Sequence, residues 1–263
     1  PLQDSCRDMM RMKKQQLQGL VTDYVAASQR KEMADRLGAQ SSCDNVIAVT
    51  MVRMMHDTAM SFDEYHDSRW VSWPFHLFDC CLVTDSGAAI IVTTAERARS
   101  LKKEPVWVLG AGEGHDHNIV SQMPDYTSTW ARRSAPLSMQ RAGITHDDLD
   151  LTMIYDSFTY TVMVTLESMG FCAPGEAADF VANQRTAPGG DFALNTSGGG
   201  LSYTHPGMYG SFLLVEAVRQ MRGECGERQV HKKGDSSRNP AISIVNGTGG
   251  SLSSTGTVVL ATG

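Results

Sequence analysis

The sequence predicts an α/β fold with a mixed or parallel sheet. Apolar segments rich in β-branched residues alternate with helical segments, an alternation typical of sheets whose faces are covered by helices. Glycines close most of these segments, and polar side chains follow the ends of several predicted strands. These three observations set the class before any single residue is considered.

Composition narrows the range of functions. The chain has 263 residues, enough for one large domain or two small ones, and 41% of them are hydrophobic. A net charge of −6 without a basic stripe argues against nucleic-acid binding. No apolar run approaches the ~20 residues of a membrane span, and no signal peptide is visible. Six cysteines without a C-x-x-C pair argue against zinc and fit a reducing compartment, so we expect a cytoplasmic protein, or a peroxisomal one in a eukaryote.

The first hundred residues are predicted to form short elements. Residues 1–40 are polar and read as an irregular connection followed by a helix, and residues 45–56 fit a helix or a buried strand, with helix favoured. Ser61 and Glu64 form a capping-box pattern that opens a short helix at 61–69. Two β-like halves follow in 78–94, and a further short helix follows at 94–101.

The remaining residues carry the main alternation. The predicted strands cover 105–112, 149–155, 240–250 and 254–261. The predicted helices cover 134–141, 159–169, 175–181 and 211–221. Pro136 is expected in the first turn of its helix, with Gly143 ending that helix and Gly170 ending the next. Residues 113–130, including His115 and His117, read as a polar loop rather than a metal site.

A glycine-rich stretch at residues 195–210 is the first candidate for a site. It combines three consecutive glycines with His205, and it feeds the helix predicted at 211–221. Glycines let a backbone approach a ligand closely, and a histidine before Pro206 is held in extended geometry. A base or an anion could be handled there. Tyr155 and Asn246 lie at strand ends, where α/β sheets bind ligands.

From about residue 60 the chain resembles the thiolase superfamily, in particular the sterol-carrier-protein-type thiolases and the lipid-transfer-protein aldolases. The blocks that carry the resemblance lie at 65–75, 79–89, 155–159, 195–206 and 215–223. The resemblance covers roughly three quarters of the chain, and the order of its blocks is specific.

The resemblance implies a thiolase-like fold of mixed sheets layered with helices, αβαβα, with an incomplete N-terminal half. Residues 1–100 would be the remainder of that half with a loop insertion, and residues 101–263 the C-terminal domain. The nucleophilic cysteine of thiolases would lie outside the given sequence. Their second cysteine stands in a Cys-x-Gly turn, and Asn246 stands in its place in the matching turn here. An asparagine cannot take a proton from an acyl-CoA.

The implied activity is therefore that of an acyl-CoA aldolase. Such an enzyme cleaves a β-hydroxyacyl-CoA by a retro-aldol step, with a steroid side-chain thioester giving a ketone and a short acyl-CoA such as propionyl-CoA. His205 stands where thiolases have their catalytic histidine, although the steroid aldolase branch typically has tyrosine there. Two alternatives stay open: a 3-ketoacyl-CoA thiolase (acetyl-CoA acyltransferase) of the sterol-carrier-protein type, and a non-catalytic subunit of a hetero-oligomer.

The candidate site residues have competing interpretations. His205 is a base, an oxyanion donor or a turn histidine, and Tyr155 is an acid or a core aromatic, since a phenol of pKa ~10 gives a proton more readily than it takes one. Asn246 is an amide donor or a turn residue. The expected oxyanion or substrate-binding set is completed by Asp156, Gly199, Gly200, Tyr203 and Tyr209, of which the glycines could instead serve loop packing and the tyrosines core packing.

The predicted partners follow from the same resemblance. We expect a CoA thioester as substrate, no cofactor or metal bound by this chain, a homodimer, and an OB-fold/zinc-ribbon acyl-CoA-binding partner protein. Cys80 and Cys81 lie in an apolar segment and are expected to be inert buried thiols.

Overall fold

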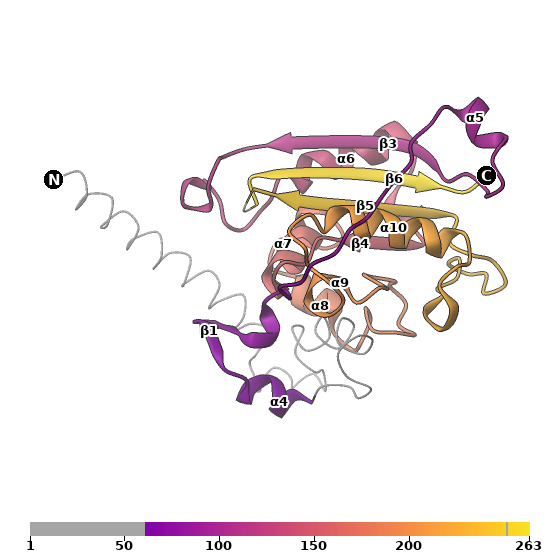
Figure 1. Cartoon of the computed structure of the whole chain (residues 1–263). Coiled ribbons are helices and arrows are strands. Elements are labelled where there is room, and N and C mark those ends of the chain that lie inside the picture. The colour runs from indigo at the N-terminus through magenta and orange to yellow at the C-terminus, as the bar shows by residue number, and fades with distance from the viewer. Residues whose placement is uncertain (1–60, 251) are drawn as a thin grey trace.

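A four-stranded mixed sheet forms the centre of the protein in the computed structural model, which describes residues 61–250 and 252–263 (Figure 1). The strand order is β3-β6-β5-β4. The strands are β3 (Trp107–His115), β4 (Leu151–Ile154), β5 (Ile242–Gly249) and β6 (Ser254–Ala261). β6 runs antiparallel to both of its neighbours, whereas β4 is parallel to β5. The α/β class and the mixed sheet are thus confirmed.

The parallel strands β4 and β5 determine where the residue after β4 lies. Ile154 at the end of β4 lies opposite Asn246 on β5. Because parallel strands share their carboxyl edge, the residue that follows each strand emerges on the same side of the sheet. Tyr155 emerges at this edge.

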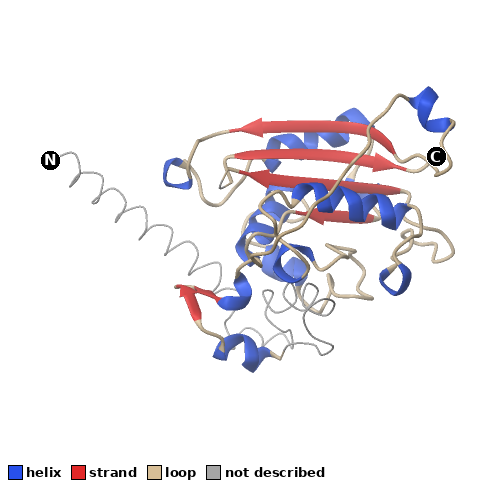
Figure 2. Ribbon diagram, viewed as in Figure 1, coloured by secondary structure: helices blue, strands red, loops and turns tan. Residues whose placement is uncertain are grey.

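Helices cover both faces of the sheet, and neighbouring strand residues alternate between the two cores. α6 (Ala131–Ala142) and α7 (Thr159–Met169) pack on the face that carries Ile154 and Ile244. α10 (Gly210–Met221) packs on the opposite face, against Val245. Figure 2 shows α10 in front of the sheet and α6 behind it. The described residues thus supply an α-β-α arrangement, three of the five layers that a thiolase-like fold implies.

α6 lies unusually close to β3 because two strand glycines face it. A Cβ at Gly110 would stand 2.1 Å from the carbonyl oxygen of Ser138, and one at Gly112 would stand 2.4 Å from that of Ser134. Any side chain at either position would push the helix away. The helix begins at Ala131, three residues before the predicted start, so Pro136 lies beyond the first turn rather than in it. Ala131 is buried in the same core cluster as Ile154 and Ile244, so the first turn of the helix packs in the core, and Pro136 lies inside the helix without an N–H to donate.

Glycines end the two helices as predicted. Gly143 closes α6 with φ 69°, and Gly170 closes α7 with φ 83°. Both residues adopt the left-handed conformation that glycine tolerates best. The other helices are α8 (Ala177–Val181) and α9 (Gly199–Ser202), together with short 3-10 turns at Val120–Gln122, His146–Asp148 and Gly226–Arg228.

Residues 61–106 contain only short elements. α4 (Phe62–Asp67) carries the predicted capping box between Ser61 and Glu64. β1 (Trp70–Ser72) pairs with β2 (Phe75–His76), a 3-10 turn follows at Leu77–Asp79, and α5 (Ala95–Arg99) precedes β3. The helices expected within 1–40 and 45–56 lie outside the described residues.

The two β-like halves predicted in 78–94 are not strands. Residues 81–93 hold no strand, and one isolated bridge joins Cys80 to Phe158. Val83, Ile91 and Val92 are 98%, 88% and 82% exposed. The β-branched pattern is real, but among the described residues no neighbouring strand completes a ladder with it. In the described part of the chain, no helix combines the length and apolar character that crossing a membrane requires.

Candidate active site

Tyr155 is the first residue after β4, and its position is set by the neighbouring strand. Its backbone N–H donates to the carbonyl oxygen of Asn246 at 3.0 Å. The side chain is 8% exposed and lies in the core on the α10 side, with Val245 and Leu213. The phenol is therefore held at the carboxyl edge of the sheet.

His205 meets Tyr155 from the glycine-rich loop. The two rings are nearly perpendicular, with centroids 5.3 Å apart and an interplanar angle of 87°. The Nε2 atom of His205 is buried and has no hydrogen-bond partner among the described residues. Burial lowers the pKa of His205, so the imidazole is neutral at pH 7. A neutral imidazole with an unused buried nitrogen is suited to accept or share a proton.

The phenols around His205 hold their protons. Burial raises the pKa of Tyr155, and a backbone hydrogen bond from Tyr209 opposes that rise. Tyr209 is fully buried, and burial raises its pKa well above the usual value. Its ring stacks on the rings of His205 and Phe212, with centroid distances of 6.1 Å and 5.9 Å. Tyr155 is thus a proton donor at neutral pH, while Tyr209 supports the imidazole by packing.

Asp156 is a fully buried carboxylate beside the glycine run. It accepts the N–H of Gly200 at 2.7 Å and that of Leu201 at 3.2 Å. A Cβ at Gly199, where φ is 69°, would stand 1.9 Å from an oxygen of this carboxylate. Gly199 and Gly200 therefore make room for Asp156, whose carboxylate occupies the amides of Gly200 and Leu201. Burial raises the pKa of Asp156 to about 7 despite these hydrogen bonds.

Asn195 is a site-supporting residue that sequence reasoning missed. Its Oδ1 accepts the N–H of Ile154 at 2.8 Å, and its Nδ2 donates to the carbonyl oxygen of the same residue at 2.8 Å. This pair of hydrogen bonds imitates a neighbouring strand and fixes the start of the loop beside Tyr155. Its place at the head of the glycine-rich stretch was the available signal, and the structure gives Asn195 a positive φ of 44°, which asparagine tolerates.

The structure does not bring the Asn246 side chain to Tyr155 and His205. Asn246 lies two residues after Ile244 on β5, so the two side chains point to the same face of the sheet, and Ile244 packs in the core on the α6 side. Its Nδ2 donates to Oγ1 of Thr257 at 2.7 Å, and Thr257 bonds the hydroxyl of Ser134 on α6 at 2.7 Å. The amide thus joins β5, β6 and α6 on the far side of the sheet.

Gly247 is the β5 residue that faces the site. A Cβ built on it would stand 3.9 Å from the Cα of Gly210, the first residue of α10. Period-two alternation along the strand explains this one-residue difference, because Val245 already points toward α10. Gly247, Thr248 and Gly249 also fit a Cys-x-Gly spacing, with glycine at the cysteine position. This edge of β5 therefore presents no side chain to the site.

Tyr203 and the neighbouring thiols lie around this centre. Tyr203 is 37% exposed, and its ring packs edge-on to Phe212. Cys80 and Cys81 are half-buried, and burial raises the pKa of Cys80 to about 11. Burial also raises the pKa of Cys81, which senses the charge of Asp156 and so lies near the site. Both thiols are protonated at neutral pH, as predicted for inert cysteines.

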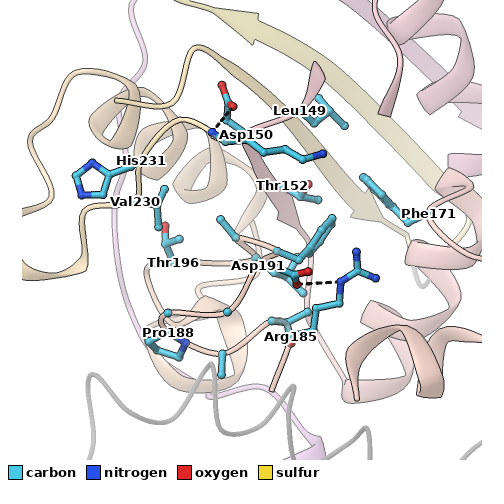
Figure 3. A pocket seen from close by; sticks show the side chains of 18 of the residues that line it. Leu149, Asp150, Thr152, Phe171, Arg185, Pro188, Asp191, Thr196, Val230 and His231 are labelled. Atoms are coloured by element: carbon cyan, nitrogen blue, oxygen red, sulfur yellow. Dashed lines mark hydrogen bonds and ion pairs between the residues drawn. The ribbon is translucent and has the colours of Figure 1, made fainter. Parts of the chain in front are cut away.

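A cavity of about 790 Å³ borders the start of the glycine-rich loop, where Leu194 and Thr196 line it (Figure 3). Phe171, Arg185 and Asp191 are among its lining residues, and Arg185 Nε donates to Asp191 at 3.1 Å. Neither Tyr155 nor His205 lines it. The unpaired imidazole nitrogen of His205 lies outside this cavity, so the candidate site is the polar cluster around His205. No group of three or more potential metal ligands occurs in residues 61–250 and 252–263.

The fold and this histidine loop define a thiolase-type protein. The family model described as "Thiolase C-terminal domain-like" matches residues 112–262, and the chain belongs to this family. The expected relation to the thiolase superfamily is thus confirmed.

Two curated relatives and one solved structure make the relation more specific. The chain is 35% identical over 197 residues to "Steroid side-chain-cleaving aldolase" of Thermomonospora curvata, covering 72% of this chain and 48% of the relative. It is 35% identical over 180 residues to "17-hydroxy-3-oxo-4-pregnene-20-carboxyl-CoA lyase" of Mycobacterium tuberculosis, covering 62% and 43%. The structure of "Ltp2-ChsH2(DUF35) aldolase" is similar, with a TM-score of 0.69 and 27% identity over 91% of this chain and 63% of that one. The chain spans about half the length of these curated relatives.

Proposed function

We propose that the chain carries the catalytic histidine loop of an acyl-CoA aldolase. The reaction is retro-aldol cleavage of a β-hydroxyacyl-CoA, with a steroid side-chain thioester giving a ketone and a short acyl-CoA such as propionyl-CoA. The observation that carries the proposal is the pairing of a neutral His205 with a protonated Tyr155 at the edge where Gly247 presents no thiol. The names of the two relatives at 35% identity support it.

His205 is the proposed base. Its free Nε2 takes the proton of the β-hydroxyl group, and the oxygen lone pair forms the ketone carbonyl as the Cα–Cβ bond breaks. The electron pair of that bond moves to the thioester and leaves an enolate. No oxidant, reductant or second thioester is consumed.

Tyr155 is the proposed acid. Its phenol, kept protonated by burial, donates a hydrogen bond to the enolate oxygen or returns a proton to Cα. Asp156 acts through the loop, since it holds the amides of Gly200 and Leu201 and thereby fixes the run that leads to His205. Tyr209 supports the imidazole by stacking.

The assembly is part of the proposal. Residues 101–263 would form the C-terminal domain and residues 1–100 the remainder of an N-terminal half, in a homodimer that uses a CoA thioester without a cofactor. The similar solved structure is named for Ltp2 together with ChsH2(DUF35), and this pairing supports an OB-fold/zinc-ribbon partner for this chain.

A 3-ketoacyl-CoA thiolase is the second candidate, favoured by the presence of His205 at the thiolase histidine position. A comparison of two substrates distinguishes the aldolase from the thiolase. The full-length protein and its partner receive a tertiary β-hydroxyacyl-CoA in one reaction and a 3-ketoacyl-CoA with free CoA in another. We expect cleavage of the first substrate only. Intact tertiary substrate together with thiolysis of the second would overturn the proposal.

A further inference from the structure

An extended segment at residues 80–86, here termed the crossing segment, touches each loop that carries a site residue. The N–H of Cys81 donates to the carbonyl oxygen of Ser157 at 2.9 Å, just after Tyr155 and Asp156. The N–H of Leu82 donates to the carbonyl oxygen of Gly200 at 3.0 Å. In Figure 1 this part of the chain passes α9 before it runs on toward α5. The crossing segment therefore ties the β4–α7 loop to the glycine-rich loop.

The third contact reaches His205 itself. The backbone N–H of His205 donates to Oγ1 of Thr84 at 2.9 Å. The same hydroxyl bonds Oγ1 of Thr204 at 2.7 Å, and Thr204 in turn bonds the hydroxyl of Ser86 at 2.7 Å. A chain of three hydroxyl groups thus joins two segments that are far apart in the sequence.

The His205 amide has special importance in this loop. Pro206 follows it and has no N–H, and Gly207 adopts a positive φ of 80°, so the backbone turns sharply here. A partly buried N–H without an acceptor carries a cost, and the Thr84 hydroxyl removes that cost only while the loop keeps its present position. The imidazole that this peptide carries stands edge-on to Tyr155.

We propose that Thr84 is a positioning residue for His205. Its hydroxyl fixes the His205 peptide, and the peptide fixes the direction in which Nε2 points. The inference rests on the proposed function only for the role of His205, because the hydrogen bond and its effect on the imidazole are properties of the fold.

The chain offers a matched pair of substitutions. Val83 is 98% exposed, whereas its neighbour Thr84 turns toward the loop. Thr84→Val keeps the shape of the side chain and removes the hydroxyl that accepts the His205 N–H. Val83→Thr makes the reverse change at the neighbouring position, which faces solvent. Thr84→Ser restores the hydroxyl. Should Thr84→Val fail to fold, Thr84→Ala removes the acceptor without placing a methyl group against the amide.

Two measurements on the full-length protein with its partner test the proposal. Cleavage of a tertiary β-hydroxyacyl-CoA should show kcat lowered about 10- to 100-fold in Thr84→Val, with KM changed little, as expected when one partly buried hydrogen bond that positions the imidazole is lost. Thr84→Ser and Val83→Thr should stay within about threefold of the unmodified protein. Histidine-labelled NMR should show the pKa of His205 rising toward its ordinary value in Thr84→Val and Thr84→Ala but not in Thr84→Ser or Val83→Thr, because a released loop exposes the ring to water.

The two measurements separate this inference from the proposed function. An unmodified protein that cleaves nothing defeats the aldolase proposal, yet the NMR titration still decides whether Thr84 holds His205. An unchanged His205 pKa in both Thr84→Val and Thr84→Ala overturns the inference. A loss of activity that Thr84→Ser does not restore also overturns it, since the hydroxyl would then not be the reason.

Discussion

The imidazole of His205 meets the phenol of Tyr155 edge to face, with ring centroids 5.3 Å apart and planes at 87°. One ring follows strand β4, and the other lies on a loop that Asn195 pins to the same strand. Burial acts on the two groups in opposite directions, lowering the pKa of the imidazole and raising that of the phenol. Both groups are consequently uncharged at neutral pH, the forms that the proposed base and acid require.

Tyr155→Phe should lower kcat by about 100-fold, because the ring keeps its packing and loses the proton that the enolate needs. KM should change little, since the phenol acts on charge that develops during bond cleavage. Steady-state kinetics on the full-length protein measure both quantities. Tyr203→Phe is the matched control, because Tyr203 is 37% exposed and packs against Phe212. Equal losses in the two variants would remove Tyr155 from the mechanism.

The pH dependence of kcat/KM follows from the same two groups. His205 must be neutral, and burial lowers its pKa below the ordinary 6.5, so activity should fall only as pH drops below that value. Tyr155 must be protonated, and its pKa lies above 10, so no alkaline loss should appear within the range of thioester stability. A pH profile from 5 to 9 tests this, at roughly unit intervals. An acidic limb centred above 6.5 would contradict the assignment of His205.

Asp156 should make the folded protein less stable as pH rises. Its pKa is about 7 when folded and 3.8 ordinarily, so the folded state binds the extra proton between these values. The contribution to the free energy of unfolding is therefore greatest below 3.8 and declines as pH rises through about 7. Denaturant unfolding of the unmodified protein and of Asp156→Asn, compared across this range, measures it. The variant should show a weaker decline with pH, and identical pH dependence would refute the assignment.

Alanine substitutions at Gly199 and Gly207 distinguish the effect of steric crowding on stability from that of backbone strain. Both have positive φ, 69° and 80°, but a Cβ at Gly199 would strike Asp156 whereas one at Gly207 meets nothing within 4 Å. Gly207→Ala should cost about 1 kcal/mol and Gly199→Ala about 2–5 kcal/mol of unfolding free energy. Chemical denaturation measures both. Similar costs would mean that the carboxylate does not fill the space beside Gly199.

Asn246 and Gly247 distinguish the two faces of β5. Asn246→Ala leaves the Thr257 hydroxyl without its amide partner and should reduce stability by about 1–3 kcal/mol. Gly247→Ala places a methyl group toward α10, where the nearest atom is 3.9 Å away, and should act mainly on kcat/KM. Unfolding and kinetic measurements on both variants decide the matter. A kinetic defect confined to Asn246→Ala would reverse the assignment of the faces.

Local signals were sufficient for much of the fold. Strand β6 at Ser254–Ala261 and helix α7 at Thr159–Met169 have the predicted bounds, because β-branched runs and a stopping glycine act within a few residues. The prediction of two strand-like halves within 78–94 was wrong because it also rested on a local β-branched run. Its residues favour extended structure, but whether a strand forms depends on a partner strand that local sequence does not specify.

The site was predictable in part. His205, Tyr155 and Tyr209 could be proposed from a glycine-rich loop and a strand end, and the structure places their rings together. The facing direction of Asn246 depends on strand register, which a shift of one residue inverts. The contacts of Thr84 and Asn195 join segments distant in sequence, and no local pattern reports such pairs.

The most direct test of the retro-aldol assignment is cleavage in the absence of free CoA. The full-length protein and its proposed partner are mixed with a tertiary β-hydroxyacyl-CoA in deuterated water, and ketone and acyl-CoA are quantified by mass spectrometry. We predict equimolar ketone and acyl-CoA, with one solvent deuterium at Cα of the acyl-CoA. A tertiary substrate that stays intact, together with cleavage of a 3-ketoacyl-CoA once free CoA is added, would contradict the assignment and indicate a thiolase.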